Sequence, residues 1–105
     1  MAVHYSNGTG SLHDKALGKP IVDIQYQLIE TDSTKYTPKK WWGEFSTKRE
    51  IKQMGNYLIE FEDGRKGECI VGNSTTPVKK SSSRWYYYSF HSRGALGRHI
   101  FLKGV

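Results

Sequence analysis

Hydrophobic and polar positions alternate with a period of two over residues 21–29. The apolar face of this run consists of Val22, Ile24, Tyr26 and Leu28. Polar residues lie between them, which is typical of a strand with one buried face. Residues 39–45 form a second run of this kind, with Trp41 and Phe45 on one face and Trp42 and Glu44 on the other. We predict two strands here, the second with Trp42 directed outward.

Residues 56–71 contain two further strand-like runs on either side of an Asp-Gly dipeptide, which favours a hairpin turn. A two-residue loop would mix apolar and charged residues on one face. A three-residue loop with a glycine bulge instead pairs Tyr57 with Cys69. The same register matches Glu60 with Lys66. The core face of this hairpin is then predicted to contain Tyr57, Ile59, Phe61, Cys69 and Val71.

The remaining segments predict one more hairpin, a helix and an arm. Residues 85–91 and 98–103 are strand-like, and we expect them to pair with each other. A capping-box pattern that begins at Thr47 predicts one short helix before Gly55. Residues 1–19 are rich in Gly, Ser, Asn and His without a sustained period. We predict that they form a flexible N-terminal arm with no regular structure.

Six short strands and no alternation of strands with helices predict an all-β fold. We expect a small six-stranded barrel or a compact sandwich with one short helix, for which SH3-like and OB-like barrels are fold analogies. A length of 105 residues suits one domain, so residues 20–105 are assigned to a single β domain. No run approaches the roughly 20 apolar residues of a membrane helix, and the first residues lack a secretory apolar segment. We therefore expect a soluble, cytoplasmic protein with no membrane contact.

Positive charge is concentrated at the end of the chain. Sixteen Lys and Arg residues against ten Asp and Glu residues give a net charge of +6, and residues 79–105 contain no acidic residue. The basic residues of this last segment are Lys79, Lys80, Arg84, Arg93, Arg98 and Lys103. A basic segment of this kind indicates a polyanionic partner.

Both faces of residues 85–91 contain aromatic rings, although only one face is needed for a core. Tyr86, Tyr88 and Phe90 alternate with Trp85, Tyr87, Ser89 and His91. If residues 98–103 pair with this strand so that Phe90 faces Ile100 in the core, His91 lies opposite His99 on the outer face. That outer face then presents Trp85, Tyr87 and Phe101 among the basic residues.

Aromatic planes beside cations are suited to single-stranded nucleic acid, because bases stack on the rings and Lys or Arg contacts the phosphates. We predict weakly selective single-stranded nucleic acid binding through the C-terminal hairpin. The predicted contact residues are Trp42, Lys79, Lys80, Arg84, Trp85, Tyr87, Arg93, Arg98, Phe101 and Lys103. A second basic and aromatic patch combines Trp42 with Lys39, Lys40, Lys48, Arg49 and Lys52, and it adjoins the first if residues 39–45 lie beside residues 85–91.

Other functions are open alternatives. The same aromatic strip suits a protein partner or a homodimer, in which case the rings are covered by the interface. His91 and His99 form a weak candidate metal pair, since two ligands are too few for a tetrahedral site, and we expect no metal or cofactor. Catalysis is disfavoured, because the hairpin register buries Cys69 and pairs Glu60 with Lys66. A single cysteine also excludes an internal disulfide.

Overall fold

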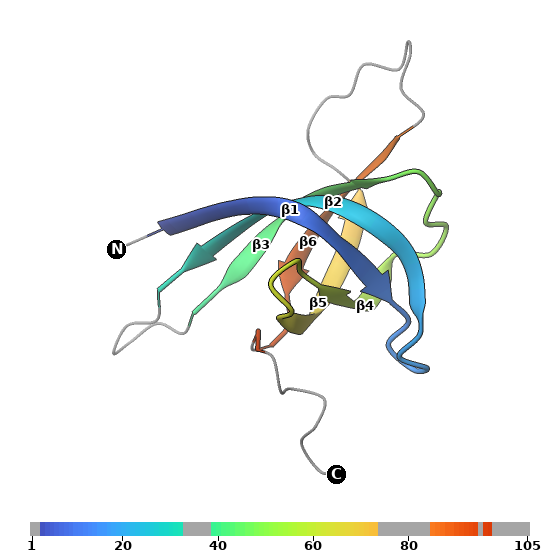
Figure 1. Ribbon diagram of the computed structural model, residues 1–105. Helices are drawn as coiled ribbons and strands as arrows, with labels where there is room; N and C mark the ends of the chain where they lie inside the picture. The colour runs from blue at the N-terminus through green and yellow to red at the C-terminus, as the bar shows by residue number, and fades with distance from the viewer. Residues whose placement is uncertain (1–2, 33–38, 74–84, 95, 98–105) are drawn as a thin grey trace.

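The computed structural model describes residues 3–32, 39–73, 85–94, 96 and 97. Within them, six antiparallel strands close into a barrel (Figure 1). The strands are β1 (Val3–His13), β2 (Pro20–Thr31), β3 (Trp41–Thr47), β4 (Gly55–Glu60), β5 (Lys66–Asn73) and β6 (Tyr86–Ser92). The order around the barrel is β1-β2-β3-β6-β5-β4, and β4 pairs with β1 to close it. The spatial order β4-β1-β2-β3 is that of a Greek key.

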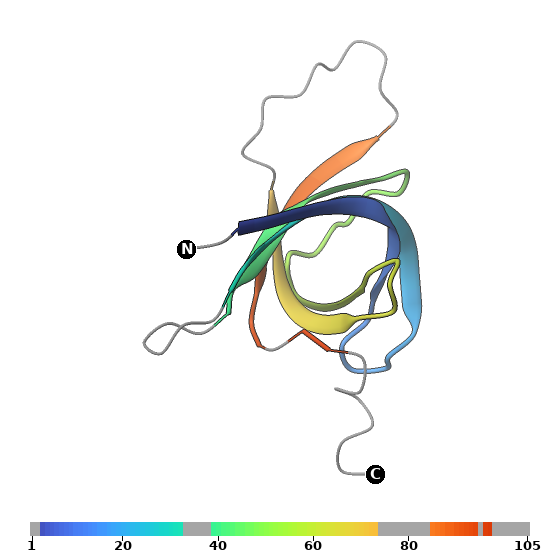
Figure 2. The ribbon, with the colours of Figure 1, turned by 60° about the vertical axis from the view of Figure 1, so that its left-hand side comes forward.

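The core lies inside the barrel, whose closed outline is visible in Figure 2. Each of the six strands contributes at least one buried apolar side chain to it. Trp41 is 1% exposed, and its ring meets those of Phe61 and Phe90 at centroid distances of 5.9 and 6.1 Å. Gly43 makes room for this packing, because a Cβ there would lie 1.9 Å from the Gln27 carbonyl oxygen and 2.9 Å from Phe90 Cζ. The barrel therefore has an aromatic core, and a glycine within β3 leaves the space that the neighbouring backbone and rings occupy.

An ion pair closes one end of the barrel. Glu30 is on the inward face of β2, and Arg65 donates to its two carboxylate oxygens at 2.7 and 2.9 Å. Lys39 Nζ lies 3.2 Å from the same carboxylate. At this end the Trp41 indole N–H also donates to the Gly94 carbonyl oxygen at 2.9 Å. Hydrogen bonding to Arg65 lowers the pKa of Glu30, although burial opposes this shift.

Most of the predicted strands are confirmed. β2 contains the first predicted run, and β3 includes residues 41–45 of the second, with Trp41 buried and Trp42 exposed. β4 and β5 have the predicted register, which pairs Tyr57 with Cys69. Gly64 has a φ of 91°, in the left-handed region that the predicted bulge requires. The all-β barrel is thus confirmed, and the sandwich alternative is not the observed closure.

The prediction that residues 1–19 lack regular structure is wrong for residues 3–13. They form β1, which pairs with β2 from Val3 to His13 and with β4 through Ser11, Leu12 and His13. Leu12 is fully buried in the core. The polar composition of β1 concealed it, because most of its residues project from the barrel into solvent and show no apolar alternation.

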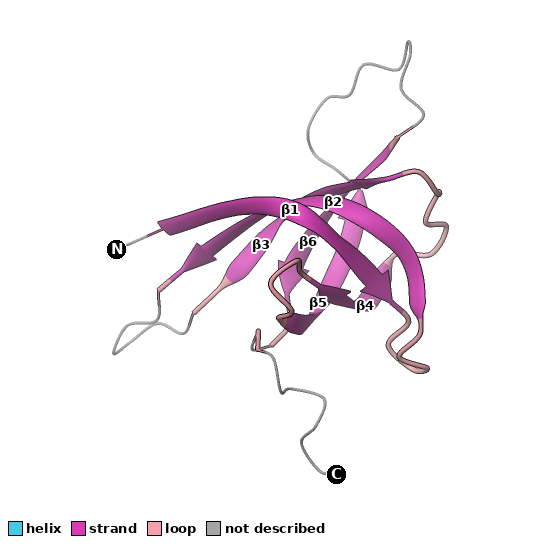
Figure 3. Cartoon of the chain, viewed as in Figure 1, coloured by secondary structure: helices cyan, strands magenta, loops and turns pink. Residues whose placement is uncertain are grey.

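The predicted short helix after Thr47 is also wrong. Figure 3 shows only strands and loops in the described part of the chain, and residues 48–54 form an irregular connection. Ile51 from this connection is buried in the core, where its backbone N–H donates to Tyr88 Oη at 2.7 Å. Ile51 is thus buried, and its N–H group is hydrogen-bonded to Tyr88, without a helical turn. The segment needs no helix to bury this apolar side chain.

The predicted pairing for β6 is a third error. β6 pairs with β3 on one edge, through Tyr86–His91, and with β5 on the other, through Tyr88–Ser92. Both edges are therefore occupied where the predicted hairpin would have formed. Residues 98–103, the expected partner, lie outside the described residues. The described residues form six strands, but one of them is β1, which the sequence analysis did not predict and which lies between β2 and β4.

Candidate functional site

The antiparallel pairing of β3 with β6 places a row of outward side chains from each strand side by side. The pairs are Trp42 with His91, Glu44 with Ser89, and Ser46 with Tyr87. We call this surface, together with Lys48 and Trp85 at its end, the outer ladder. Its length from Trp42 to Lys48 is about 20 Å at roughly 3.4 Å per residue.

The rings of the outer ladder are accessible. Trp42 is 37% exposed and Tyr87 is 40% exposed, whereas Tyr88 and Phe90 on the inward face of β6 are buried. The sequence analysis correctly assigned these faces. It placed Tyr86 with the buried residues, but Tyr86 is exposed, because β5 pairs only with Tyr88–Ser92 and leaves the start of β6 uncovered on that side.

Trp85 and Lys48 extend the ladder past the last β3–β6 pair. The Lys48 ammonium lies 5.3 Å from the centre of the Trp85 ring, a distance at which a cation is attracted to an aromatic face. The contact requires β3 and β6 to be neighbours. The structure therefore joins residues from both predicted patches, the one around Trp42 and the one around Trp85, into one surface.

The opposite end of the ladder is apolar. Ile29 of β2 lies beside Trp42, and Ile70 of β5 lies beside His91, so four adjacent strands contribute to one row. Between the two ends stands Glu44, a carboxylate that the sequence analysis placed on the same face as Trp42. The ladder thus has a cationic end at Lys48, an acidic centre and an apolar end.

Many of the predicted contact residues lie outside the described part of the chain. These are Lys79, Lys80, Arg84, Arg98, Phe101 and Lys103, and His99 of the candidate metal pair lies outside it as well. Arg93 is described and exposed, but it is at the end of β6 opposite Trp85, and its Nε lies 3.2 Å from Glu68 Oε2. Lys15 contacts the same carboxylate at 2.6 Å. Arg93 therefore belongs to an ion-pair cluster on β5 and not to the outer ladder.

The predicted second basic patch is divided. Lys39 precedes β3 and contacts Glu30, whereas Lys48 and Arg49 follow the same strand. The seven residues of β3 separate the two groups by about 23 Å at roughly 3.3 Å per residue. Only the second group adjoins Trp85.

The described residues are balanced in charge. They contain ten Lys and Arg residues and all ten Asp and Glu residues of the chain. The net charge of +6 therefore resides in the amino-acid sequence outside the described ranges. On the barrel itself, local arrangement rather than overall charge determines where an anion would be attracted.

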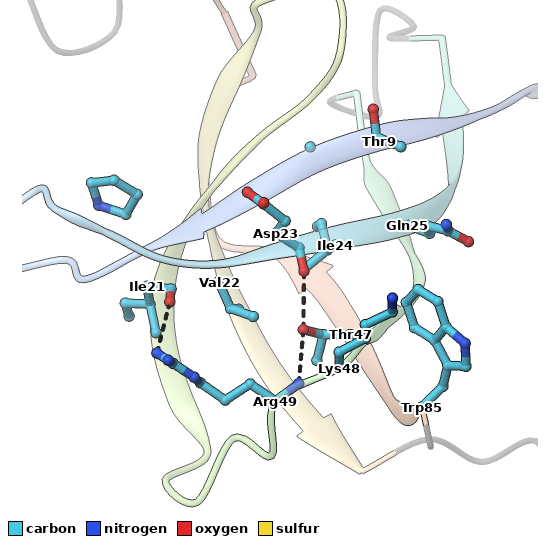
Figure 4. Close-up of a pocket in the computed structure, with 12 residues that line it drawn as sticks. Thr9, Ile21, Val22, Asp23, Ile24, Gln25, Thr47, Lys48, Arg49 and Trp85 are labelled. Atoms are coloured by element: carbon cyan, nitrogen blue, oxygen red, sulfur yellow. Dashed lines mark hydrogen bonds between the residues drawn. The ribbon is translucent and has the colours of Figure 1, made fainter. Parts of the chain in front are cut away.

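A groove lies beside the cationic end of the ladder and was missed by the sequence analysis. It has a volume of about 890 Å³ and runs between β2 and the segment that follows β3 (Figure 4). Its lining includes Ile21–Gln25 from β2, Thr47–Arg49 and Trp85. No local sequence pattern predicts the groove, because it forms where β2 continues beyond the end of its pairing with β3.

Groups with catalytic or metal-binding chemistry are few among the described residues. Cys69 is buried, and burial raises the pKa of its thiol to about 12, so the reactive thiolate is suppressed. His13 Nε2 lies 2.8 Å from Ser11 Oγ and 3.3 Å from Glu60 Oε1 on the surface of β1 and β4. Within the described ranges, no group of three His, Cys, Asp or Glu residues is placed to hold a metal ion.

Comparison of the chain with protein-family models, with curated proteins and with solved structures finds no significant match. The described ranges also include no helix with the length and apolar character needed to cross a membrane.

Proposed function

We propose that the protein binds single-stranded nucleic acid along the outer ladder. The observation that supports this most directly is the row of accessible rings on two paired strands, with Lys48 beside Trp85 at its end. Trp42 and Tyr87 are exposed although the core is already complete without them. Bases stack on such rings whatever their sequence, which favours weak selectivity.

Different residues of the outer ladder are expected to contact the bases and the phosphates. Trp42 and Tyr87 provide stacking surfaces, each worth about 1–3 kcal/mol for a base by alanine substitution. Lys48 provides a cation for a phosphate, and each phosphate that is neutralised contributes about 0.7 to the salt dependence of binding to a single strand. Glu44 stands between the rings and disfavours a phosphate at the centre. Phosphate contacts are therefore expected towards Lys48.

Fluorescence anisotropy of a labelled single-stranded oligonucleotide tests the proposal at two salt concentrations. Replacement of both rings in the variant Trp42→Ala/Tyr87→Ala is expected to weaken binding at least 25-fold, with about 5-fold or more from each ring. Leu17→Ala is the matched control, because Leu17 is an exposed apolar residue in the turn after β1 and lies off the ladder. It is expected to bind like the unaltered protein.

Two results would overturn the proposal. One is an absence of oligonucleotide binding at low salt. The other is equal binding by the double variant and the Leu17→Ala control. Sedimentation of the same proteins examines the alternative that the apolar row at Trp42 joins two copies of the chain. A dimer that becomes a monomer in the double variant, with no oligonucleotide bound by either protein, would assign the ladder to self-association.

A further inference from the structure

The groove beside Trp85 originates from a mismatch between β2 and β3. Their pairing ends at Gln25 with Ser46, but β2 continues to Pro20 with β1 as its partner. Side chains then span the gap. Thr47 Oγ1 donates to the Asp23 carbonyl oxygen at 3.0 Å, and Arg49 donates to the Ile21 carbonyl oxygen at 3.3 Å (Figure 4). The two backbones are thereby held apart, and space remains between them.

The exposed edge of β2 supplies a backbone donor to this space. Carbonyl oxygens of Ile21 and Asp23 point toward Arg49 and Thr47, and the N–H of a strand residue points to the same side as its own carbonyl oxygen. Thr31 lies an even number of positions further along β2, so it faces the same side of the strand. Its N–H donates to the Lys40 carbonyl oxygen there. The N–H group of Asp23 therefore faces the groove beyond the last residue paired with β3, whereas Ile21 lies where the β1–β2 register shifts.

Cations and one ring complete the lining. Lys48 lies against the Trp85 ring, and Arg49 uses one guanidinium N–H on the Ile21 carbonyl oxygen, which leaves four further N–H donors. Among the described residues that line the groove, Asp23 contributes the one carboxylate, but in Figure 4 its side chain projects from the opposite side of β2 from Thr47 and Arg49. The wall around Lys48 and Arg49 is thus positively charged, with an indole at its rim.

We propose that this groove binds a nucleoside monophosphate unit, with the base against Trp85 and the phosphate between Lys48 and Arg49. The inference rests on the proposed function, since Trp85 and Lys48 also end the outer ladder, and it assigns a nucleotide pocket to that end. Lys48 exchanges its contact with the indole for one with the phosphate, and the base takes the place on the ring. The N–H group of Asp23 provides a donor for an acceptor atom of the base or the phosphate.

Titration of the ¹⁵N-labelled full chain with adenosine monophosphate tests this pocket by NMR. Saturable shifts are expected at the Trp85 indole N–H and at the amides of Ile21 and Asp23. Trp85→Ala is expected to weaken binding about 5-fold or more, as measured at the two amides. Lys48→Met is expected to weaken it less. Lys52→Met is the matched control, because Lys52 is an exposed lysine that does not line the groove.

Inorganic phosphate is a second probe and separates the two parts of the pocket. It is expected to shift Arg49 and its neighbours and to shift the Trp85 indole less than adenosine monophosphate does, because it can draw Lys48 from the ring but has no base to stack. An indole that does not respond to adenosine monophosphate overturns the inference. So does an affinity that is the same in Trp85→Ala, Lys48→Met and the Lys52→Met control.

The Trp42→Ala/Tyr87→Ala variant distinguishes failure of this inference from failure of the proposed function. If both hold, the variant loses oligonucleotide affinity but retains the shifts that adenosine monophosphate causes at Trp85. Oligonucleotide binding without any response to the mononucleotide would remove the pocket and leave the ladder. A response to the mononucleotide without oligonucleotide binding would remove the proposed role of the ladder and leave the pocket.

Discussion

The two ends of the barrel differ in how their polar groups are hydrogen-bonded. At one end, the inward carboxylate of Glu30 is paired with Arg65 and Lys39, and the Trp41 indole N–H is bonded to Gly94. At the other, β2 separates from the chain after β3, and single hydrogen bonds from Thr47 and Arg49 bridge the gap. The first end satisfies its polar groups internally. The second leaves donors and a ring directed at solvent.

This difference separates stability from binding. Removal of a group from the ion-paired end exposes or orphans atoms that nothing else can satisfy, so it should cost folding free energy. Removal of a group from the groove end leaves atoms that water can satisfy, so it should affect ligands more than folding. The comparison can be tested by altering chemically similar residues at the two ends.

The largest contrast is expected between two tryptophans. Trp41→Ala should lower the free energy of unfolding by about 3–5 kcal/mol, because it leaves a cavity in the aromatic core. Trp85→Ala should lower it by about 1 kcal/mol or less, since Trp85 is only half-buried at the rim of the groove. Urea denaturation of both variants measures the difference. Equal losses would show that the two ends are not distinct in this way.

Arg65→Met is expected to lower the free energy of unfolding by about 1–3 kcal/mol, because it leaves the buried Glu30 carboxylate with Lys39 as its remaining cation. The double variant Glu30→Leu/Arg65→Met removes the charge as well and should recover part of this loss. Thermal or urea denaturation provides the measurement. A double variant less stable than Arg65→Met would contradict the idea that the orphaned carboxylate is the cause.

Acid should weaken the ion-paired end selectively. The pKa of Glu30 is lowered in the folded protein, chiefly by its hydrogen bonds from Arg65. The stabilisation is therefore fully present above the unfolded pKa, near 4.5, and is lost as the pH falls through the lower folded value. Glu30→Gln should show a shallower loss of stability below about pH 4.5 when unfolding is followed as a function of pH. Parallel curves for the two proteins would sink this explanation.

The smallest effect is expected at the bridge across the groove. Thr47→Val removes the hydrogen bond to the Asp23 carbonyl oxygen and should cost about 1 kcal/mol. Because this bond helps to set the separation of the two backbones, the variant should also change the amide shifts of Ile21 and Asp23 without any ligand. Unchanged shifts would mean that Arg49 alone maintains the groove.

The sequence predicted the barrel well where one strand face was apolar. β2, β3 and the β4–β5 hairpin show clear alternation, and a glycine bulge set the register of the hairpin. β1 could not be found this way, because it is rich in Gly, Ser and Asn. It becomes a strand because long-range partners on β2 and β4 pair with its backbone, and backbone pairing leaves no trace in side-chain polarity.

The candidate site was predictable in part. Alternation along residues 85–91 correctly placed Tyr87 and His91 outward, but local pattern cannot tell which strand is the neighbour. The predicted neighbour was the next strand-like segment in the sequence, whereas the observed neighbours are β3 and β5. The groove was beyond prediction, because it depends on where one strand outlasts its partner.

Closure of the barrel by β1 makes the start of the chain indispensable. Shortening the protein by its first 13 residues, which look expendable in composition, would strip one neighbour from β2 and one from β4. Two bare edges and an open core would result, and bare edges recruit strands from other molecules. The polar strand β1 is thus the element that closes the barrel and covers the edges of β2 and β4 within each molecule.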